Sequence, residues 1–133
     1  MKYLLDTHTF IWKLGDTGKI PAKVFVATEN PDNDVFISSV SLWEIAIKTR
    51  RKKLDLGGVN NDELIGLAEK MGIQTLSLTP HEAVTYGNLT ENSHFDPFDR
   101  MLIWQAISRK LILVSNDSEF HRFVPNGLKL LWK

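Results

Sequence analysis

The chain alternates short, continuous apolar runs with longer segments of helical spacing, and this alternation constrains the fold more than any other feature. Runs that continue without polar alternation indicate strands buried on both faces. Strands separated by helices imply right-handed crossovers and a parallel sheet covered on both sides. We therefore expect an α/β protein, a three-layer α/β/α sandwich. The five expected strands lie at residues 2–5, 35–38, 73–78, 111–115 and 128–132.

Three segments between these runs have the apolar spacing of amphipathic helices. Each also carries a side chain suited to an N-cap, and the last has a proline at its first helical position. The segment 61–72 ends in glycine, which is a common helix stop. The expected helices span residues 41–54, 61–72 and 96–110, and their expected N-caps are Ser39 or Ser41, Asn61 or Asp62, and Asp96.

Length and composition favour one compact domain over residues 1–133, with 43% hydrophobic residues and 16 basic against 16 acidic side chains. The absence of cysteine excludes a disulfide scaffold, thiolate zinc sites and a cysteine nucleophile. The first apolar run is too short for a signal peptide, and no apolar stretch approaches a membrane span. We expect a cytoplasmic protein without a membrane partner. The neutral total weighs mildly against a nucleic-acid binder.

Carboxylates follow the strands at the positions where ligands gather in open parallel sheets, beyond the carboxyl ends of the strands. Asp6 directly follows the first apolar run, and Asp117 follows the fourth. Glu44 lies about one turn into the helix after the second run. Asp96 and Asp99 open the helix that leads into the fourth run.

Each of these acids has a structural explanation, as a helix cap, a first-turn residue or a surface residue. Taken together, the structural explanation is weaker, because caps need not converge and Glu44 lies in an apolar stretch. Carboxylates brought close together take up protons unless a cation neutralises them. Ligands that offer only oxygen favour Mg²⁺ or Mn²⁺ over zinc, and the sequence does not choose between the two.

Other motifs carry less information. The basic run 48–53 places Lys48, Arg50 and Arg51 where they would contact phosphates beside the pocket, or where they would form a solvated helix end. "HEAVT" lacks the second histidine of a zinc-protease helix, and neither a phosphate-binding glycine loop nor a Gly-x-Ser-x-Gly elbow is present. His8, His94 and His121 are scattered, and structural roles are favoured for them.

Four segments, "YLLDTHTFIW", "SSVSLWEIAIK", "DPFDRMLIWQA" and "LVSNDSEF", together resemble the PIN domain, and specifically the VapC-type toxin ribonucleases of bacterial toxin–antitoxin pairs. The resemblance runs from Lys2 to about Phe123. It implies a five-stranded parallel sheet in the order 3-2-1-4-5. It also implies a site built from Asp6, Glu44, Asp99 and Asp117, with Asp96 as the extra acid of the "DPFDR" subset. Ser115 would supply a hydroxyl where many relatives have threonine.

The function expected from the acids and the resemblance is a Mg²⁺- or Mn²⁺-dependent endoribonuclease that hydrolyses phosphodiester bonds with one or two ions. Asp6, Asp99 and Asp117 are the expected core ligands, with Asp96 beside them, and Glu44 would bind a second ion or position the attacking water. The resemblance implies an RNA substrate, an antitoxin that covers the site, and a homodimer. The alternatives are a non-catalytic module, a DNA-directed nuclease and a phospho-acceptor domain. A phospho-acceptor domain needs an aspartate after its third strand, and this chain has none there.

Overall fold

The computed structural model describes residues 1–94 and 96–132, and its centre is a five-stranded, all-parallel sheet in the order β3-β2-β1-β4-β5. This confirms the predicted strand order. The strands at residues 73–78, 111–115 and 128–132 are shorter than predicted, because each pairs with its neighbour over only three or four residues. The strands are β1 (Lys2–Leu5), β2 (Asp34–Ser38), β3 (Ile73–Leu76), β4 (Ile112–Val114) and β5 (Lys129–Leu131).

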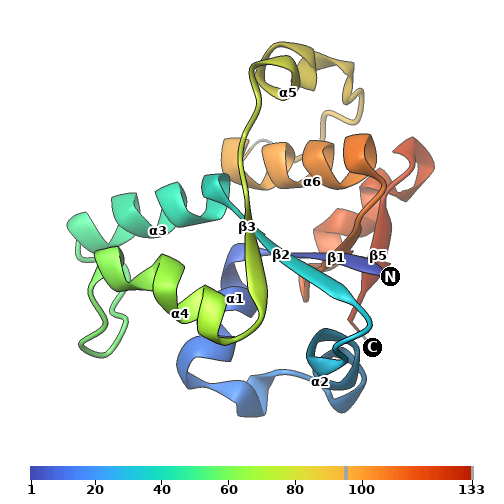
Figure 1. Cartoon of the computed structure of the whole chain (residues 1–133). Coiled ribbons are helices and arrows are strands. Elements are labelled where there is room, and N and C mark those ends of the chain that lie inside the picture. Colours follow the sequence, from blue (N-terminus) through green and yellow to red (C-terminus); the bar gives the residue numbers. More distant parts are fainter. Residues whose placement is uncertain (95, 133) are drawn as a thin grey trace.

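Helices connect the strands and cover both faces of the sheet, with α6 on one side and α1 and α4 on the other (Figure 1). The α-helices are α1 (Thr7–Gly15), α2 (Ala22–Glu29), α3 (Ser39–Arg50), α4 (Leu64–Lys70), α5 (Pro80–Thr85) and α6 (Pro97–Arg109). Short 3₁₀ helices are η1 (Thr17–Lys19), η2 (Asn61–Glu63), η3 (Tyr86–Asn88) and η4 (Ser118–Asn126).

Two of the predicted N-caps were wrong by a residue or more. Helix α3 is capped by Ser38, whose hydroxyl accepts the backbone N–H of Val40 at 3.0 Å, because β2 runs into the helix without a loop. A capping box on Asn60 opens η2, which leads into α4. Asp96 is the N-cap of α6 as predicted, and its Oδ1 accepts the N–H of Asp99 at 2.9 Å.

The core divides into two apolar clusters, one on each face of the sheet. Tyr3 and Leu5 of β1 belong to one cluster and Leu4 to the other, as the two-residue period of a strand requires. Helix α3 leaves the sheet at its carboxyl edge and contributes Val40 to one cluster and Ile45 to the other. This three-layer packing fixes where α3 and α6 begin, and both helices carry predicted site residues.

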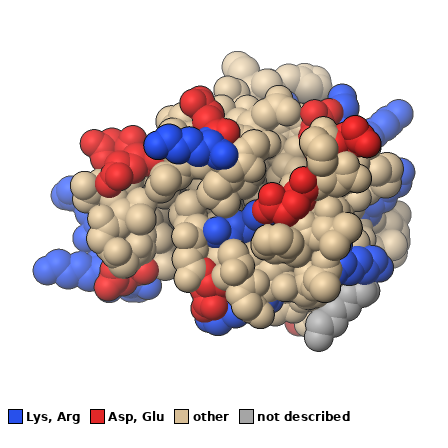
Figure 2. Space-filling model, turned by 60° about the horizontal axis from the view of Figure 1, so that its bottom comes forward, with Lys and Arg blue, Asp and Glu red and all other residues tan. Residues whose placement is uncertain are grey.

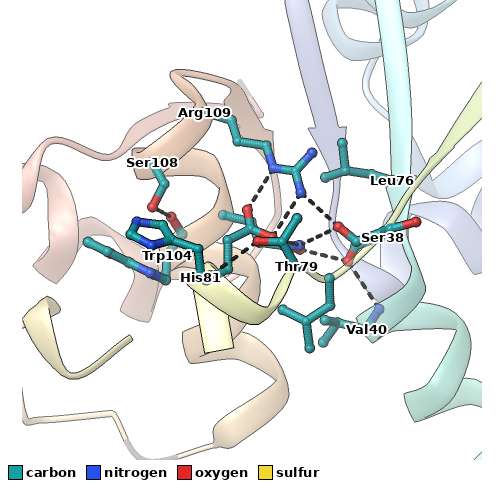
Figure 3. A network of polar contacts seen from close by, with 12 residues as sticks. Ser38, Val40, Leu76, Thr79, His81, Trp104, Ser108 and Arg109 are labelled. Carbon is teal, nitrogen blue, oxygen red and sulfur yellow. Dashed lines mark hydrogen bonds and ion pairs between the residues drawn. The ribbon is translucent and has the colours of Figure 1, made fainter. Parts of the chain in front are cut away.

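A buried polar network ties α5 and α6 to the end of β2 (Figure 3). Ser38 donates to Gln105 Oε1 at 2.6 Å, and Gln105 Nε2 donates to Glu82 Oε1 at 3.1 Å. Arg109 Nε donates to Glu82 Oε2 at 2.6 Å. Burial alone would raise the pKa of Glu82, but these donors and the backbone N–H of Thr79 lower it to about 2. We call Ser38, Glu82, Gln105 and Arg109 the Glu82 network.

The surface carries charges of both signs. On the face drawn in Figure 2, acidic and basic side chains are mixed, with uncharged surface between them. This mixture agrees with the net charge of zero. No helix within residues 1–94 and 96–132 is long and apolar enough to cross a membrane.

Candidate metal centre

The strand register brings the first site residue to the centre of the carboxyl edge. Leu5 pairs with Ile37 of β2 and with Val114 of β4, so the residues that follow these three strands meet at one edge. Asp6 is held there by two backbone contacts. Its N–H donates to Val114 O at 3.0 Å, and its Oδ1 caps α1 by accepting the N–H of Thr9 at 2.8 Å.

A pocket of about 360 Å³ opens at this edge, and all the acids predicted from the sequence line it. It is built from the residues that follow β1 and β4, from α1 and the middle of α3, from the start of α6, and from the start of η4. The predicted residues on its wall are Asp6, Glu44, Lys48, Asp96, Asp99 and Asp117, and they are joined by His8, Trp12, Asn116 and Phe120.

Three predicted residues lie outside the pocket wall. Ser115 is buried behind it, where its hydroxyl accepts the N–H of Asp117 at 3.0 Å and hydrogen-bonds to Asp6. Arg50 ends α3, and Arg51 follows in the turn. Both arginines are exposed, and the helix ends four residues earlier than predicted, because Lys52 adopts a left-handed conformation with φ of 58°.

Two of the carboxylates, Asp6 and Asp99, have pKa values above the ordinary value for aspartate. Burial raises the pKa of Asp6 above its ordinary value, although hydrogen bonds from Ser115 and Thr9 act in the opposite direction. Burial, together with the nearby charges of Asp96 and Glu44, raises the pKa of Asp99 to about 6, against the effect of its hydrogen bond to His94. Burial is the largest cause of both shifts, and only at Asp99 do neighbouring carboxylates add to it.

Glu44 is buried, with only 3% of its surface exposed, and it is firmly oriented. Its Oε1 lies 2.7 Å from Thr7 Oγ1, which is 2.9 Å from Ser41 Oγ. Since the Thr7 hydroxyl has one proton, it donates to the carboxylate and accepts from Ser41. Oε2 pairs with the ammonium of Lys48, one helical turn away, and this contact raises the pKa of Lys48. The arrangement aims one carboxylate and one ammonium into the same pocket.

His94, for which the sequence favoured a structural role, lies beside two of the predicted acids. Its Nε2 lies 2.9 Å from Asp99 Oδ2, and ligand atoms of His94, Asp99 and Asp117 all lie within 4.8 Å of one another. The histidine precedes the cap of α6 by two residues and reaches the site from the connecting segment. The sequence indicated its position only through its place just before "DPFDR", and a single histidine in a loop forms no spacing pattern that predicts a contact.

The donor set fits a divalent cation. A carboxylate pair and an imidazole lie within a few ångström of one another, and Asp6 and Asp96 line the same cavity. Lys48 brings one positive charge to these carboxylates, and a hard ion bound by their oxygens would bring more. By contrast, the buried carboxylate of Glu82 is already paired with the guanidinium of Arg109.

Solved structures with similar folds include VapBC2 from Rickettsia felis bound to a promoter DNA fragment, with TM-score 0.74, 20% identity and full coverage of both chains. VapBC-1 from nontypeable Haemophilus influenzae has TM-score 0.68 and 20% identity, covering 98% of this chain and 97% of that chain. VapBC-5 from Mycobacterium tuberculosis has TM-score 0.59 and 18% identity, covering 99% and 98%. At these identities the likeness is one of fold.

No curated protein sequence matches the chain. A family match, however, extends over residues 3–124, from the second residue of β1 into η4, and its description is PIN domain. The matched span includes every acid of the pocket. The chain therefore belongs to the PIN domain family.

Proposed function

We propose that this protein is a metal-dependent endoribonuclease and the toxin of a toxin–antitoxin module. The observation that carries the proposal is the convergence of Asp6, Glu44, Asp99 and Asp117 in one pocket, with two of their pKa values raised by burial. Members of the PIN domain family are generally nucleases. The structural relatives described above are VapBC proteins, and the description of VapBC-5 names it a member of a toxin–antitoxin family.

In the proposed reaction, Asp6, Asp99 and Asp117 hold Mg²⁺ or Mn²⁺, and Asp96 adds negative charge at the rim. The bound ion supplies Lewis-acid polarisation of a phosphate oxygen and lowers the pKa of a water. Glu44 is fixed by Thr7 and Lys48, so its carboxylate is oriented to take a water proton without rotating. The Lys48 ammonium, on the same wall, is placed to attract the scissile phosphate.

The proposal extends to substrate and partners through the resemblance to VapC-type toxins. RNA is the substrate, and Lys48, Arg50 and Arg51 line its approach along the end of α3. A cognate antitoxin covers the pocket, and the toxin forms a homodimer. The structural neighbours that support this extension include VapBC2, which was solved bound to a promoter DNA fragment, and FitAcB from Neisseria gonorrhoeae. A single copy of the domain, residues 1–133, carries the complete set of acids.

The direct test is cleavage of a structured RNA by purified protein, with and without EDTA, and with Mg²⁺ or Mn²⁺ restored. We expect Asp6→Asn and Asp99→Asn to lower the rate by about 100-fold or more, the scale of loss for a group acting on transition-state charge. The matched control is Asp62→Asn on the exposed surface of η2, which should cleave as the wild type does. Full activity in both folded site variants would refute the proposal, and cleavage of single-stranded DNA alone would redirect it to a DNA-directed nuclease.

A further inference from the structure

We propose that His94 is a metal ligand through Nε2, and that this nitrogen makes the site prefer Mn²⁺ to Mg²⁺. The inference rests on the proposed metal site and adds a residue and an ion preference to it. It is carried by three observations: the distances within the His94–Asp99–Asp117 group, the way the imidazole is held, and the chemistry of a nitrogen ligand.

The distances match a shared ion. Two ligands at right angles on an ion about 2.1 Å from each lie roughly 3 Å apart, and ligands on opposite sides lie roughly 4.2 Å apart. His94 Nε2 and Asp99 Oδ2 are 2.9 Å apart, and all three ligand atoms lie within 4.8 Å of one another. A shift of a few tenths of an ångström in a side chain such as Asp117 would bring the three around one ion.

The imidazole is held in place from two directions. Its ring packs edge-on against Phe120 and Phe123, with ring centroids 5.8 and 6.4 Å apart. The main chain of His94 is fixed by Arg100, a buried residue of α6 whose guanidinium donates to the carbonyl oxygens of Leu89, Glu91 and His94. Ligands held by such outer contacts lose little freedom on binding metal, and this raises affinity.

Nitrogen coordination separates the two candidate ions. Mg²⁺ takes oxygen ligands and keeps much of its water shell, whereas transition-metal ions accept imidazole more readily. A site that adds an imidazole to its carboxylates therefore gains more from Mn²⁺ than a site made of carboxylates alone. The neutral imidazole also leaves the charge of the bound ion to balance Asp99, Asp117 and the neighbouring acids.

The competing explanation is that His94 only forms an ion pair with Asp99 that closes the loop onto α6. The two explanations predict opposite effects of removing His94 on the affinity for metal. If His94 is merely a counter-charge, a bound ion must displace it, and its removal strengthens metal binding. If His94 is a ligand, its removal weakens the binding of Mn²⁺ and has much less effect on Mg²⁺.

The test is pulsed electron paramagnetic resonance of Mn²⁺ bound to the full-length protein, with titration calorimetry of Mn²⁺ and Mg²⁺. We expect a ¹⁴N coupling of a directly bound imidazole that becomes a ¹⁵N coupling when histidine is ¹⁵N-labelled. It should disappear in His94→Gln and persist in His8→Gln, the matched control, because His8 is a histidine that lines the pocket but is not part of the His94–Asp99–Asp117 group. His94→Gln should lower Mn²⁺ affinity by about tenfold or more and Mg²⁺ affinity by less than about threefold.

Bound Mn²⁺ without nitrogen coupling, tighter metal binding by His94→Gln, or no Mn²⁺ binding at millimolar concentration would each overturn the inference. The labelled wild-type spectrum shows whether an imidazole binds the ion even if His94→Gln fails to fold. The outcome is separable from the proposed activity. RNA cleavage by a protein whose Mn²⁺ shows no nitrogen coupling rejects the ligand and leaves the nuclease. If the Mn²⁺ shows nitrogen coupling but the protein cleaves no RNA, the ligand assignment stands and the nuclease proposal is rejected.

Discussion

The two ends of helix α6 place carboxylates in opposite electrostatic states. At its N-terminal end, Asp99 has a pKa raised to about 6 by burial and by the charges of Asp96 and Glu44. At its C-terminal end, Arg109 pairs with Glu82, whose pKa is lowered to about 2 despite burial. Glu82 is buried and Asp99 is partly buried, and both carboxylates take part in hydrogen bonds.

The difference shows that burial alone does not identify a functional acid. Glu82 has a permanent cation and two further donors, so its charge is balanced within the fold. Asp99 is hydrogen-bonded to His94, but burial and the charges of Asp96 and Glu44 outweigh that contact and raise its pKa. The nearby ammonium of Lys48 pairs with Glu44 instead. A stable protein tolerates such an imbalance where function requires it, and perturbed acids accordingly cluster at functional sites.

The largest expected effect on stability comes from breaking the ion pair between Arg109 and Glu82 at the C-terminal end of α6. Arg109→Met leaves the Glu82 carboxylate buried without its cation, and we expect the free energy of unfolding to fall by about 3 kcal/mol. Urea unfolding at pH 7 measures the change. The matched control is Arg122→Met, which breaks the exposed pair with Glu119 and should cost about 0.5 kcal/mol or less. Equal losses in the two variants would show that the Glu82 network is no more than a surface pair.

The next effect is the pH dependence of the same network. Because the pKa of Glu82 is lower in the folded state than its ordinary value of 4.5, the unfolded chain binds more protons between pH 4.5 and about 2. Its contribution, on the order of 3 kcal/mol, is therefore present above pH 4.5 and is lost as the pH falls towards 2. Glu82→Gln should be less stable than the wild type at pH 7, and the difference should disappear near pH 2. A constant difference across this range would contradict the assignment.

The architecture was predictable from sequence because buried parallel strands leave continuous apolar runs, and their order followed from the resemblance. The acids Asp6, Glu44, Asp99 and Asp117 were found because they follow strands or open helices at the carboxyl edge, where topology gathers them. Ser38 was missed as a cap because β2 and α3 join without a loop. His94 and the Glu82 network were missed because they depend on contacts between residues distant in sequence that follow no periodicity.

A smaller pH dependence of stability, of opposite sign, is expected from Asp99 at the N-terminal end of α6. Because the pKa of Asp99 is higher in the folded state than its ordinary value of 3.8, the folded chain binds more protons between pH 3.8 and about 6. Its contribution to the free energy of unfolding therefore falls as the pH rises through that range. In EDTA at pH 7.5, Asp99→Asn should be more stable than the wild type by about 1–2 kcal/mol, and at pH 3.5 it should not.

Urea unfolding at the two pH values measures this difference, and added Mn²⁺ supplies the control. The ion should stabilise the wild type and recover little or nothing in Asp99→Asn, because the variant lacks a ligand. A destabilised Asp99→Asn in EDTA would mean that the Asp99 carboxylate is balanced as Glu82 is, and the contrast between the two ends of α6 would be lost.

The smallest effect separates the two roles of Asp96, which caps α6 and lines the pocket. Asparagine caps a helix about as well as aspartate, so Asp96→Asn should change stability by less than about 0.5 kcal/mol, whereas Asp96→Ala should cost about 1 kcal/mol. Both variants remove a charge that raises the pKa of Asp99, so the pKa of Asp99 should fall equally in both, as measured by carboxyl-carbon NMR titration. If it falls only in Asp96→Ala, the pKa of Asp99 depends on the order of the helix terminus.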